Sequence, residues 1–148
     1  QYYVCFSHTG AHNKVVSNQH KKNKPFDYLD NKVAVVISAH RPIGIDIEIN
    51  AVKWQVAQRF FHVNEMAILQ TLPPMQRDII AKLLWQIKES FIKVFQYKLA
   101  QGLGKDYSHL IADLIKDATS KSPLLDINDN KSNYRIALLP HQQTVIVY

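Results

Sequence analysis

Residues 75–100 most restrict the folds open to this chain, because they form one long run of apolar side chains at helical spacing. The apolar positions recur three and four residues apart: Ile79, Ile80, Leu83, Leu84, Ile87, Phe91, Ile92 and Phe95. This period predicts an α-helix with one side buried against the rest of the protein. We expect the helix to span residues 75–100 and the region to end at Gly102-Leu103-Gly104.

A short β-branched segment, Gly44–Glu48, predicts a strand that carries two carboxylates. Side chains alternate along a strand, so Asp46 and Glu48 share one face, and Ile45 and Ile47 lie on the other face towards a core. Two neighbouring carboxylates repel each other unless a cation lies between them or one is protonated. The pair therefore predicts a site for a hard divalent cation, Mg²⁺ or Mn²⁺, and a solvent-facing strand edge is the structural alternative.

The long helix adds a third carboxylate and a cation. Within residues 85–93, Lys93 follows Glu89 by four positions and so lies on the same side of the helix. Three carboxylates and an ammonium suit a metal-bound pyrophosphate, because the metal bridges phosphate oxygens and the lysine neutralises charge on the leaving group. The candidate metal ligands are Asp46, Glu48 and Glu89.

The remaining segments predict an α+β fold in which an antiparallel sheet packs with the long helix. Strands are expected at Tyr2–Phe6, which should be buried, and at Val33–Ser38, Ile43–Ile49, Tyr134–Leu139 and Thr144–Tyr148. We expect the second and third of these to pair as an antiparallel hairpin and residues 7–10 to form a turn. Helices are expected at 51–61 and at 62–72, the latter capped by Asn64. Residues 106–119 have helical spacing but are left open, and 120–133 are expected to be a loop.

Composition narrows the classes of function. The 148 residues suffice for one domain, and no apolar run reaches the roughly 18 residues of a membrane span. With no signal-peptide pattern and with Cys5 as the single cysteine, a cytoplasmic location is expected. The net charge of +6 favours an acidic or phosphorylated partner. The basic region Lys14–Lys32 is either a solvated loop or a patch that steers such a partner. Nucleic-acid-binding motifs are absent from the sequence, so nucleic acid is not an expected partner.

Four ordered motifs in residues 6–93 resemble those of the 4′-phosphopantetheinyl transferase superfamily. Gly44–Glu48 is similar to its G-I-D-I-E motif, and residues 85–93 are similar to W-x-x-K-E-S-x-x-K. Residues 6–10 resemble the S-H-S/T-G segment of the surfactin-synthetase-activating type. Residues 59–61 with Glu65 resemble its R-F-F-x-x-x-E run. Each match is weak alone, but their order and spacing together make the resemblance specific.

The resemblance implies a defined reaction. The 4′-phosphopantetheine arm of coenzyme A is transferred to a serine of an acyl or peptidyl carrier protein, with Mg²⁺ (or Mn²⁺), and 3′,5′-ADP is released. This is the activity of a holo-acyl-carrier-protein synthase. By the resemblance, Asp46, Glu48 and Glu89 hold the metal, and Glu89, directly or through water, also accepts the serine proton.

Other residues of the motifs are assigned to the cofactor by the same resemblance. Lys93, and with it Lys88, would hold the phosphates, while Ser7 and His8 would lie beside the 3′-phosphate of coenzyme A. Glu65 matches a glutamate of the family, and its alternative role is a helix-start charge that favours the helix dipole.

One departure concerns the extent of the chain. Longer members of the family have two similar lobes with the cofactor between them, and residues 1–148 resemble a single domain, the second lobe, with the first largely absent. The chain is then a fragment, a subunit that assembles with copies of itself, or a degenerate member. The competing hypotheses are a non-catalytic module that binds coenzyme A or an acidic carrier protein, and a Mg²⁺-dependent nucleotide hydrolase.

Overall fold

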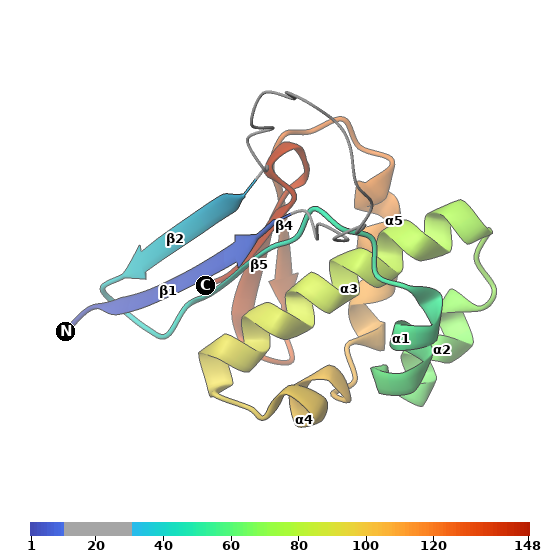
Figure 1. The fold of residues 1–148 in the computed structure, drawn as a ribbon, viewed down its shortest axis with the longest axis horizontal. Coiled ribbons are helices and arrows are strands. Elements are labelled where there is room, and N and C mark those ends of the chain that lie inside the picture. The colour runs from blue at the N-terminus through green and yellow to red at the C-terminus, as the bar shows by residue number, and fades with distance from the viewer. Residues whose placement is uncertain (11–30) are drawn as a thin grey trace, which may run out of the picture.

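The computed structural model describes residues 1–10 and 31–148 (Figure 1). A four-stranded antiparallel sheet has the order β3-β6-β5-β4 and consists of β3 (Gly44–Ile47), β4 (Leu125–Asp129), β5 (Tyr134–Leu139) and β6 (Thr144–Val147). A separate antiparallel ribbon pairs β1 (Tyr3–Thr9) with β2 (Lys32–Ser38). The α+β class with antiparallel sheets and a long helix is confirmed.

The long helix α3 (Pro74–Phe95) lies across the four-stranded sheet (Figure 1). The shorter helices are α1 (Trp54–Phe60), α2 (Val63–Leu69), α4 (Leu99–Leu103) and α5 (Ile111–Ala118), with 3₁₀ turns η1 (Ser108–Leu110) and η2 (Pro140–Gln142). Among the side chains that form the core between helices and sheet are Ile80, Leu84, Ile87, Phe91, Leu114, Ile136, Leu138, Val145 and Val147. The apolar period of α3 therefore predicted the side of the helix that is buried.

The end of α3 differs from the expectation. The helix stops at Gln96, which adopts the left-handed conformation with φ 55°, and the chain continues into α4. Gly102 lies inside α4 rather than at the end of the long helix. A Cβ at Gly102 would lie 2.0 Å from Cγ1 of Ile92, so this glycine permits the close packing of α4 on α3. The left-handed residue at the end of the helix is a glutamine and not the usual glycine, so the sequence did not indicate where the helix ends.

The predicted hairpin of residues 33–38 with 43–49 is wrong. Strand β2 pairs with β1, with Phe6 opposite Val35, and β3 pairs with β6, with Asp46 opposite Val145. Residues 7–9 continue strand β1 rather than forming the expected turn. Alternation of side chains identifies a strand but does not select its partner, so sequence neighbours were a poor guide here.

The apolar face of the β1–β2 ribbon is exposed, whereas β1 was expected to be buried. Its six apolar side chains are 60–74% exposed: Tyr2, Val4, Phe6, Val33, Val35 and Ile37. The opposite face of β1 carries the buried Ser7 and Thr9. In the described residues, the ribbon therefore uses its small polar side chains, and not its apolar ones, to contact the rest of the fold.

Smaller differences concern caps and loops. His62, not Asn64, caps α2: its Nδ1 accepts from the Asn64 backbone N–H at 3.2 Å, and Glu65 accepts from the His62 N–H at 2.9 Å. The segment 120–133, expected to be a loop, contains β4, and the open segment 106–119 forms η1 and α5. Of the basic region Lys14–Lys32, only the last two positions lie within the described residues. No helix of the described chain is long and apolar enough to span a membrane.

Strand β3 and helix α3 approach each other closely at one glycine. A Cβ on Gly44 would lie 2.0 Å from the backbone oxygen of Ser90, and the Ser90 side chain is itself fully buried. The Ser90 hydroxyl donates to Gln86 O at 2.9 Å and lies 3.4 Å from Val145 O. Because the atoms of Ser90 that face Gly44 belong to the backbone, they cannot move aside by a rotamer change.

Replacing Gly44 with alanine is expected to lower the free energy of unfolding by about 1–3 kcal/mol, because the added methyl group must separate β3 from α3. Urea denaturation followed by circular dichroism measures this change. Gly104→Ala is the matched control, since its Cβ would lie 3.3 Å from the nearest atom, Ala100 O, and a much smaller loss is expected. Equal losses for the two variants would contradict the proposed role of Gly44.

Candidate active site

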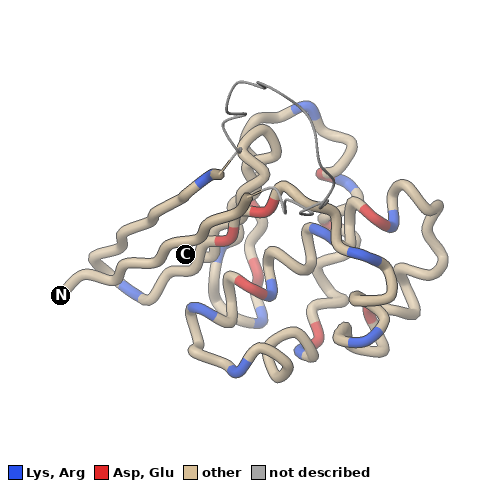
Figure 2. Tube along the Cα trace, in the orientation of Figure 1, with Lys and Arg blue, Asp and Glu red and all other residues tan. Residues whose placement is uncertain are grey.

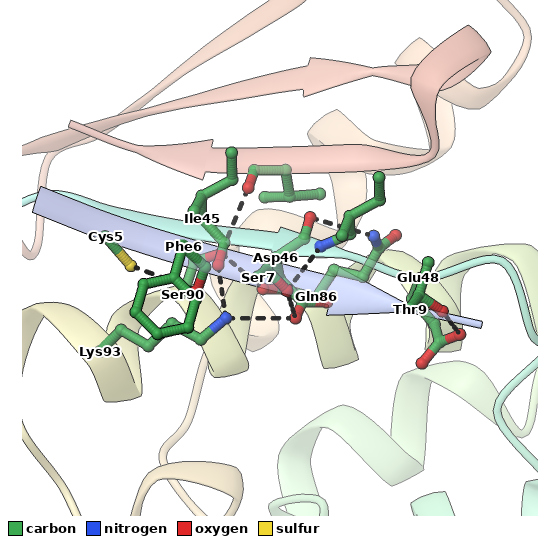
Figure 3. Close-up of polar contacts among 12 residues, drawn as sticks. Cys5, Phe6, Ser7, Thr9, Ile45, Asp46, Glu48, Gln86, Ser90 and Lys93 are labelled. Atoms are coloured by element: carbon green, nitrogen blue, oxygen red, sulfur yellow. Dashed lines mark hydrogen bonds and ion pairs between the residues drawn. The ribbon is translucent and has the colours of Figure 1, made fainter. Parts of the chain in front are cut away.

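The predicted acidic strand lies directly against α3, and Lys93 of that helix reaches it (Figure 3). Lys93 Nζ donates to Ile45 O at 2.5 Å and lies 3.5 Å from Asp46 Oδ1. All four residues of β3 are buried, so the strand is covered on both faces. The alternative of a solvent-facing strand edge is therefore wrong for Asp46, although Ile45 is buried as expected.

Two hydroxyls of β1 hold the carboxylates of the acidic strand (Figure 3). Ser7 Oγ donates to Asp46 Oδ1 at 3.3 Å, and Thr9 Oγ1 donates to Glu48 Oε1 at 3.0 Å. Glu48 Oε1 also accepts from the backbone and side-chain N–H groups of Asn50, at 2.7 and 3.0 Å. Sequence reasoning missed Thr9 altogether, although its two-residue spacing from Ser7 matches the spacing of Asp46 and Glu48.

The third carboxylate, Glu89, is affected by the charges of the first two. Burial, reinforced by the charges of Asp46 and Glu48, raises the pKa of Glu89, while Lys93 opposes this shift. Burial also raises the pKa of Asp46, against the effects of Lys93 and Ser7, and the Glu48 charge adds to the rise. Two carboxyls with raised pKa values, beside the carboxylate of Glu48, form the kind of oxygen donor set that a hard divalent cation stabilises.

The carboxylates do not yet converge as a formed metal site. Among residues 1–10 and 31–148, no three His, Cys, Asp or Glu side chains are arranged to hold a metal ion. In this structure Asp46 is engaged by Lys93 and Ser7 instead. The chemistry of the donor set fits Mg²⁺ or Mn²⁺, and the hydrogen bonds described above hold one oxygen each of Asp46 and Glu48.

Lys82 and Gln86 of α3 also face the acidic strand, and the sequence did not single them out. Gln86 Nε2 donates to Gln143 O at 2.7 Å and lies 3.5 Å from Asp46 O. Burial lowers the pKa of Lys82, while the charges of Glu48 and Asp46 act in the opposite direction. Both side chains line a cavity of about 350 Å³ between α3, α5 and the β5–β6 turn, although Asp46, Glu48 and Glu89 are not among its lining residues. Figure 2 shows that basic and acidic positions lie close together along α3.

Lys88 does not reach this site, and its predicted role as a phosphate ligand is not supported. Its Nζ is fully buried, pairs with Glu65 Oε1 at 2.8 Å and donates to Leu103 O and Lys105 O at 2.7 and 2.5 Å. Glu65 is equally buried and also accepts from the Tyr107 backbone N–H at 2.8 Å. All three ammonium protons thus have partners on the side of α3 that faces α2 and η1, and Glu65 is a structural residue of the same network.

Ser7 and His8 lie on opposite faces of β1. Ser7 is buried against Asp46 and accepts from the Ile47 backbone N–H at 3.2 Å, whereas His8 is exposed. The structure therefore joins Asp46, Lys93 and Ser7 by direct contacts, with Glu48 and Glu89 linked to them electrostatically, and leaves His8 apart from them. The predicted role of Ser7 and His8 at the 3′-phosphate of coenzyme A stays a prediction.

Comparison with known proteins identifies the family of the chain. The family model described as the 4′-phosphopantetheinyl transferase superfamily matches residues 42–146. The chain belongs to this superfamily. It is 43% identical over 65 residues to 4′-phosphopantetheinyl transferase gsp of Aneurinibacillus migulanus, an alignment that covers 43% of the chain and 27% of the relative.

A second relative gives a similar result. The chain is 34% identical over 73 residues to 4′-phosphopantetheinyl transferase psf-1 of Bacillus pumilus, which covers 49% of the chain and 31% of the relative. The alignments thus span less than a third of the length of each of these relatives. No solved structure matches the chain significantly.

Replacing Glu89 with glutamine is expected to stabilise the metal-free protein at neutral pH. A carboxyl whose pKa is raised in the folded state costs stability as the pH rises through its usual value near 4.5 to the raised value, and glutamine removes this cost. The difference in thermal midpoint between variant and wild type should therefore vanish well below pH 4.5, grow as the pH rises towards the raised pKa, and stay constant above it. A difference that does not depend on pH would contradict the electrostatic assignment of Glu89.

Replacing Lys88 with methionine is expected to lower the free energy of unfolding by about 3–5 kcal/mol, because Glu65 would be left buried without its counter-ion. Urea denaturation measures the loss. Lys98→Met, at the exposed residue before α4, is the matched control and should change stability by less than about 0.5 kcal/mol. A fully stable Lys88→Met protein would restore a ligand role as the explanation for this lysine.

Proposed function

We propose that this chain catalyses transfer of the 4′-phosphopantetheine group of coenzyme A to a serine of an acyl or peptidyl carrier protein, and that the reaction depends on Mg²⁺. The observation that supports the proposal is the contact of Lys93 with Asp46 where β3 packs on α3, together with the effect of the Asp46 and Glu48 charges on Glu89. Membership of the superfamily supports the same reaction class. A module that only binds acidic partners would gain nothing from three mutually repelling carboxylates.

The three carboxylates would hold the divalent cation. Asp46, Glu48 and Glu89 provide hard oxygen ligands, and Mn²⁺ could replace Mg²⁺ in such a set. When bound, the cation would neutralise charge on the pyrophosphate of coenzyme A. Lys93 lies beside Asp46 and would contribute a second positive charge from the protein itself.

The chain's own residues would position the reactants and move one proton. The serine oxygen of the carrier protein forms a bond to the β-phosphorus, and the bond from that phosphorus to the bridging oxygen breaks. The electron pair leaves with 3′,5′-ADP, whose developing charge Lys93 neutralises. Glu89, directly or through one water molecule, takes the serine proton, and its raised pKa brings its basicity closer to neutral pH.

Other parts of the assignment concern binding. Of the two residues predicted at the 3′-phosphate of coenzyme A, the exposed His8 remains the candidate, since the buried Ser7 hydroxyl is engaged by Asp46 and the Ile47 N–H. The positive net charge of +6 suits an acidic carrier protein. We further propose that the first lobe of the longer family members, or another copy of the chain, completes the coenzyme A site, since the matched segments cover less than a third of each relative.

Intact-mass spectrometry of apo carrier proteins tests the proposal. Fatty-acid, polyketide and peptide-synthetase carriers would each be incubated with the chain, coenzyme A and Mg²⁺, with EDTA as control. A gain of one phosphopantetheine group that EDTA abolishes would establish the transfer and identify the carrier class. No gain, with coenzyme A still bound in calorimetry, would favour a non-catalytic lobe. If the carrier gains no mass and coenzyme A does not bind, the proposal is overturned.

In this assay, Asp46→Asn, Glu48→Gln and Glu89→Gln are each expected to lower the transfer rate at least about 100-fold, because each removes a charged metal ligand. Asp78→Asn is the matched control on α3, since Asp78 is exposed and pairs with its neighbour Arg77, and its rate should match the wild type. Full activity of Asp46→Asn at saturating Mg²⁺ would show that the metal assignment is wrong.

A further inference from the structure

Strand β1 runs alongside β3, and the two strands are joined by a repeated pair of side-chain hydrogen bonds. Ser7 Oγ accepts from the Ile47 N–H at 3.2 Å and donates to Asp46 Oδ1, while Thr9 Oγ1 accepts from the Ile49 N–H at 3.4 Å and donates to Glu48 Oε1. Two steps along β1 correspond to two steps along β3, in the same direction. The contact is therefore a regular arrangement of two hydroxyls, and not a single chance hydrogen bond.

The edge position of β3 explains why hydroxyls are needed. One edge of β3 pairs with β6, so alternate N–H groups, those of Ile47 and Ile49, point to the other edge, where β1 lies. A hydroxyl has one proton and two lone pairs, so accepting from a backbone N–H leaves the O–H free to donate to the adjacent carboxylate. Ser7 and Thr9 are each only 7% exposed, which limits competition from water.

The hydroxyls hold one oxygen of each carboxylate and leave the other oxygen free. Ser7 and Lys93 both contact Oδ1 of Asp46, and Thr9 and Asn50 both contact Oε1 of Glu48. In the part of the chain that the structure describes, Oδ2 of Asp46 and Oε2 of Glu48 accept no hydrogen bond. Within that same part, the one side-chain nitrogen or oxygen that is both buried and unpartnered is His109 Nδ1, so Asp46 Oδ2 still reaches solvent.

We propose that Ser7 and Thr9 are positioning residues, which orient Asp46 and Glu48 so that their free oxygens face a common divalent cation. The inference rests on the proposed function, because it assigns the two hydroxyls to the same metal site. Partners that orient metal ligands in this way commonly contribute 10–100-fold to metal affinity. The alternative is that both hydroxyls serve only to cover the edge of β3.

Thr9→Val is the informative change, because valine keeps the shape and strand preference of threonine and removes only the hydroxyl. Mn²⁺ binding to the full chain with coenzyme A, followed by electron paramagnetic resonance, should weaken about 10-fold. Thr9→Ser should restore it. Thr119→Val removes an exposed hydroxyl that bonds Lys116 O and should bind Mn²⁺ like the wild type. In transfer assays, the KM for Mg²⁺ should rise more than kcat falls.

The outcomes separate the two levels of the proposal. Unchanged Mn²⁺ affinity in Thr9→Val, with a lower thermal midpoint, would assign Thr9 to edge covering alone and overturn the inference while the proposed function stands. Failure of the wild type itself to bind Mn²⁺ with coenzyme A would overturn both. Ser7→Ala provides a second measurement at Asp46, and it too should weaken Mn²⁺ binding while the chain stays folded by circular dichroism.

Discussion

The close packing of β3 on α3 is the contact on which the candidate site depends. At Gly44 the two backbones approach so closely that a methyl group would overlap Ser90 O. This approach places the carboxylate of Asp46 within 3.5 Å of Lys93, three residues further along the same helix from Ser90. Two motif residues without any chemical role of their own, a glycine and a serine, thus bring the reactive side chains of two distant motifs together.

The motif W-x-x-K-E-S-x-x-K divides between two sides of α3. Glu89 and Lys93 belong to the side that meets β3, whereas Lys88 is turned towards α2 and η1 and forms a buried ion pair with Glu65. Each side therefore has a different task. The side facing β3 carries the charges proposed to act on a ligand. The side facing α2 anchors the helix through the Lys88–Glu65 ion pair, and removal of either partner would destabilise the fold.

Sequence alone predicted the fold class and the buried side of α3, because the apolar period is a local property, while the carboxylate set stays a prediction. It failed where the outcome depends on partners distant in sequence. The alternation of residues 33–38 identified a strand, but nothing local indicated that β2 would pair with β1. Lys88 was assigned to the phosphates by the family resemblance, and only the packing of α2 on α3 reveals that its ammonium is buried. Thr9 could have been found, since its spacing from Ser7 mirrors that of Asp46 and Glu48.

The way in which β1 docks on β3 has a thermodynamic consequence. Ser7 and Thr9 contact β3 through side chains, so the β1–β2 ribbon could detach without breaking the ladder of the four-stranded sheet. Detachment would break the hydrogen bonds from Ser7 and Thr9 that orient the carboxylates, and a bound cation would require this orientation. Docking of the ribbon and occupancy of the site would then be linked equilibria, in which a cation that binds the docked state also suppresses local opening. Protection of the β1 amides against hydrogen exchange would thereby report on cation binding at the carboxylates.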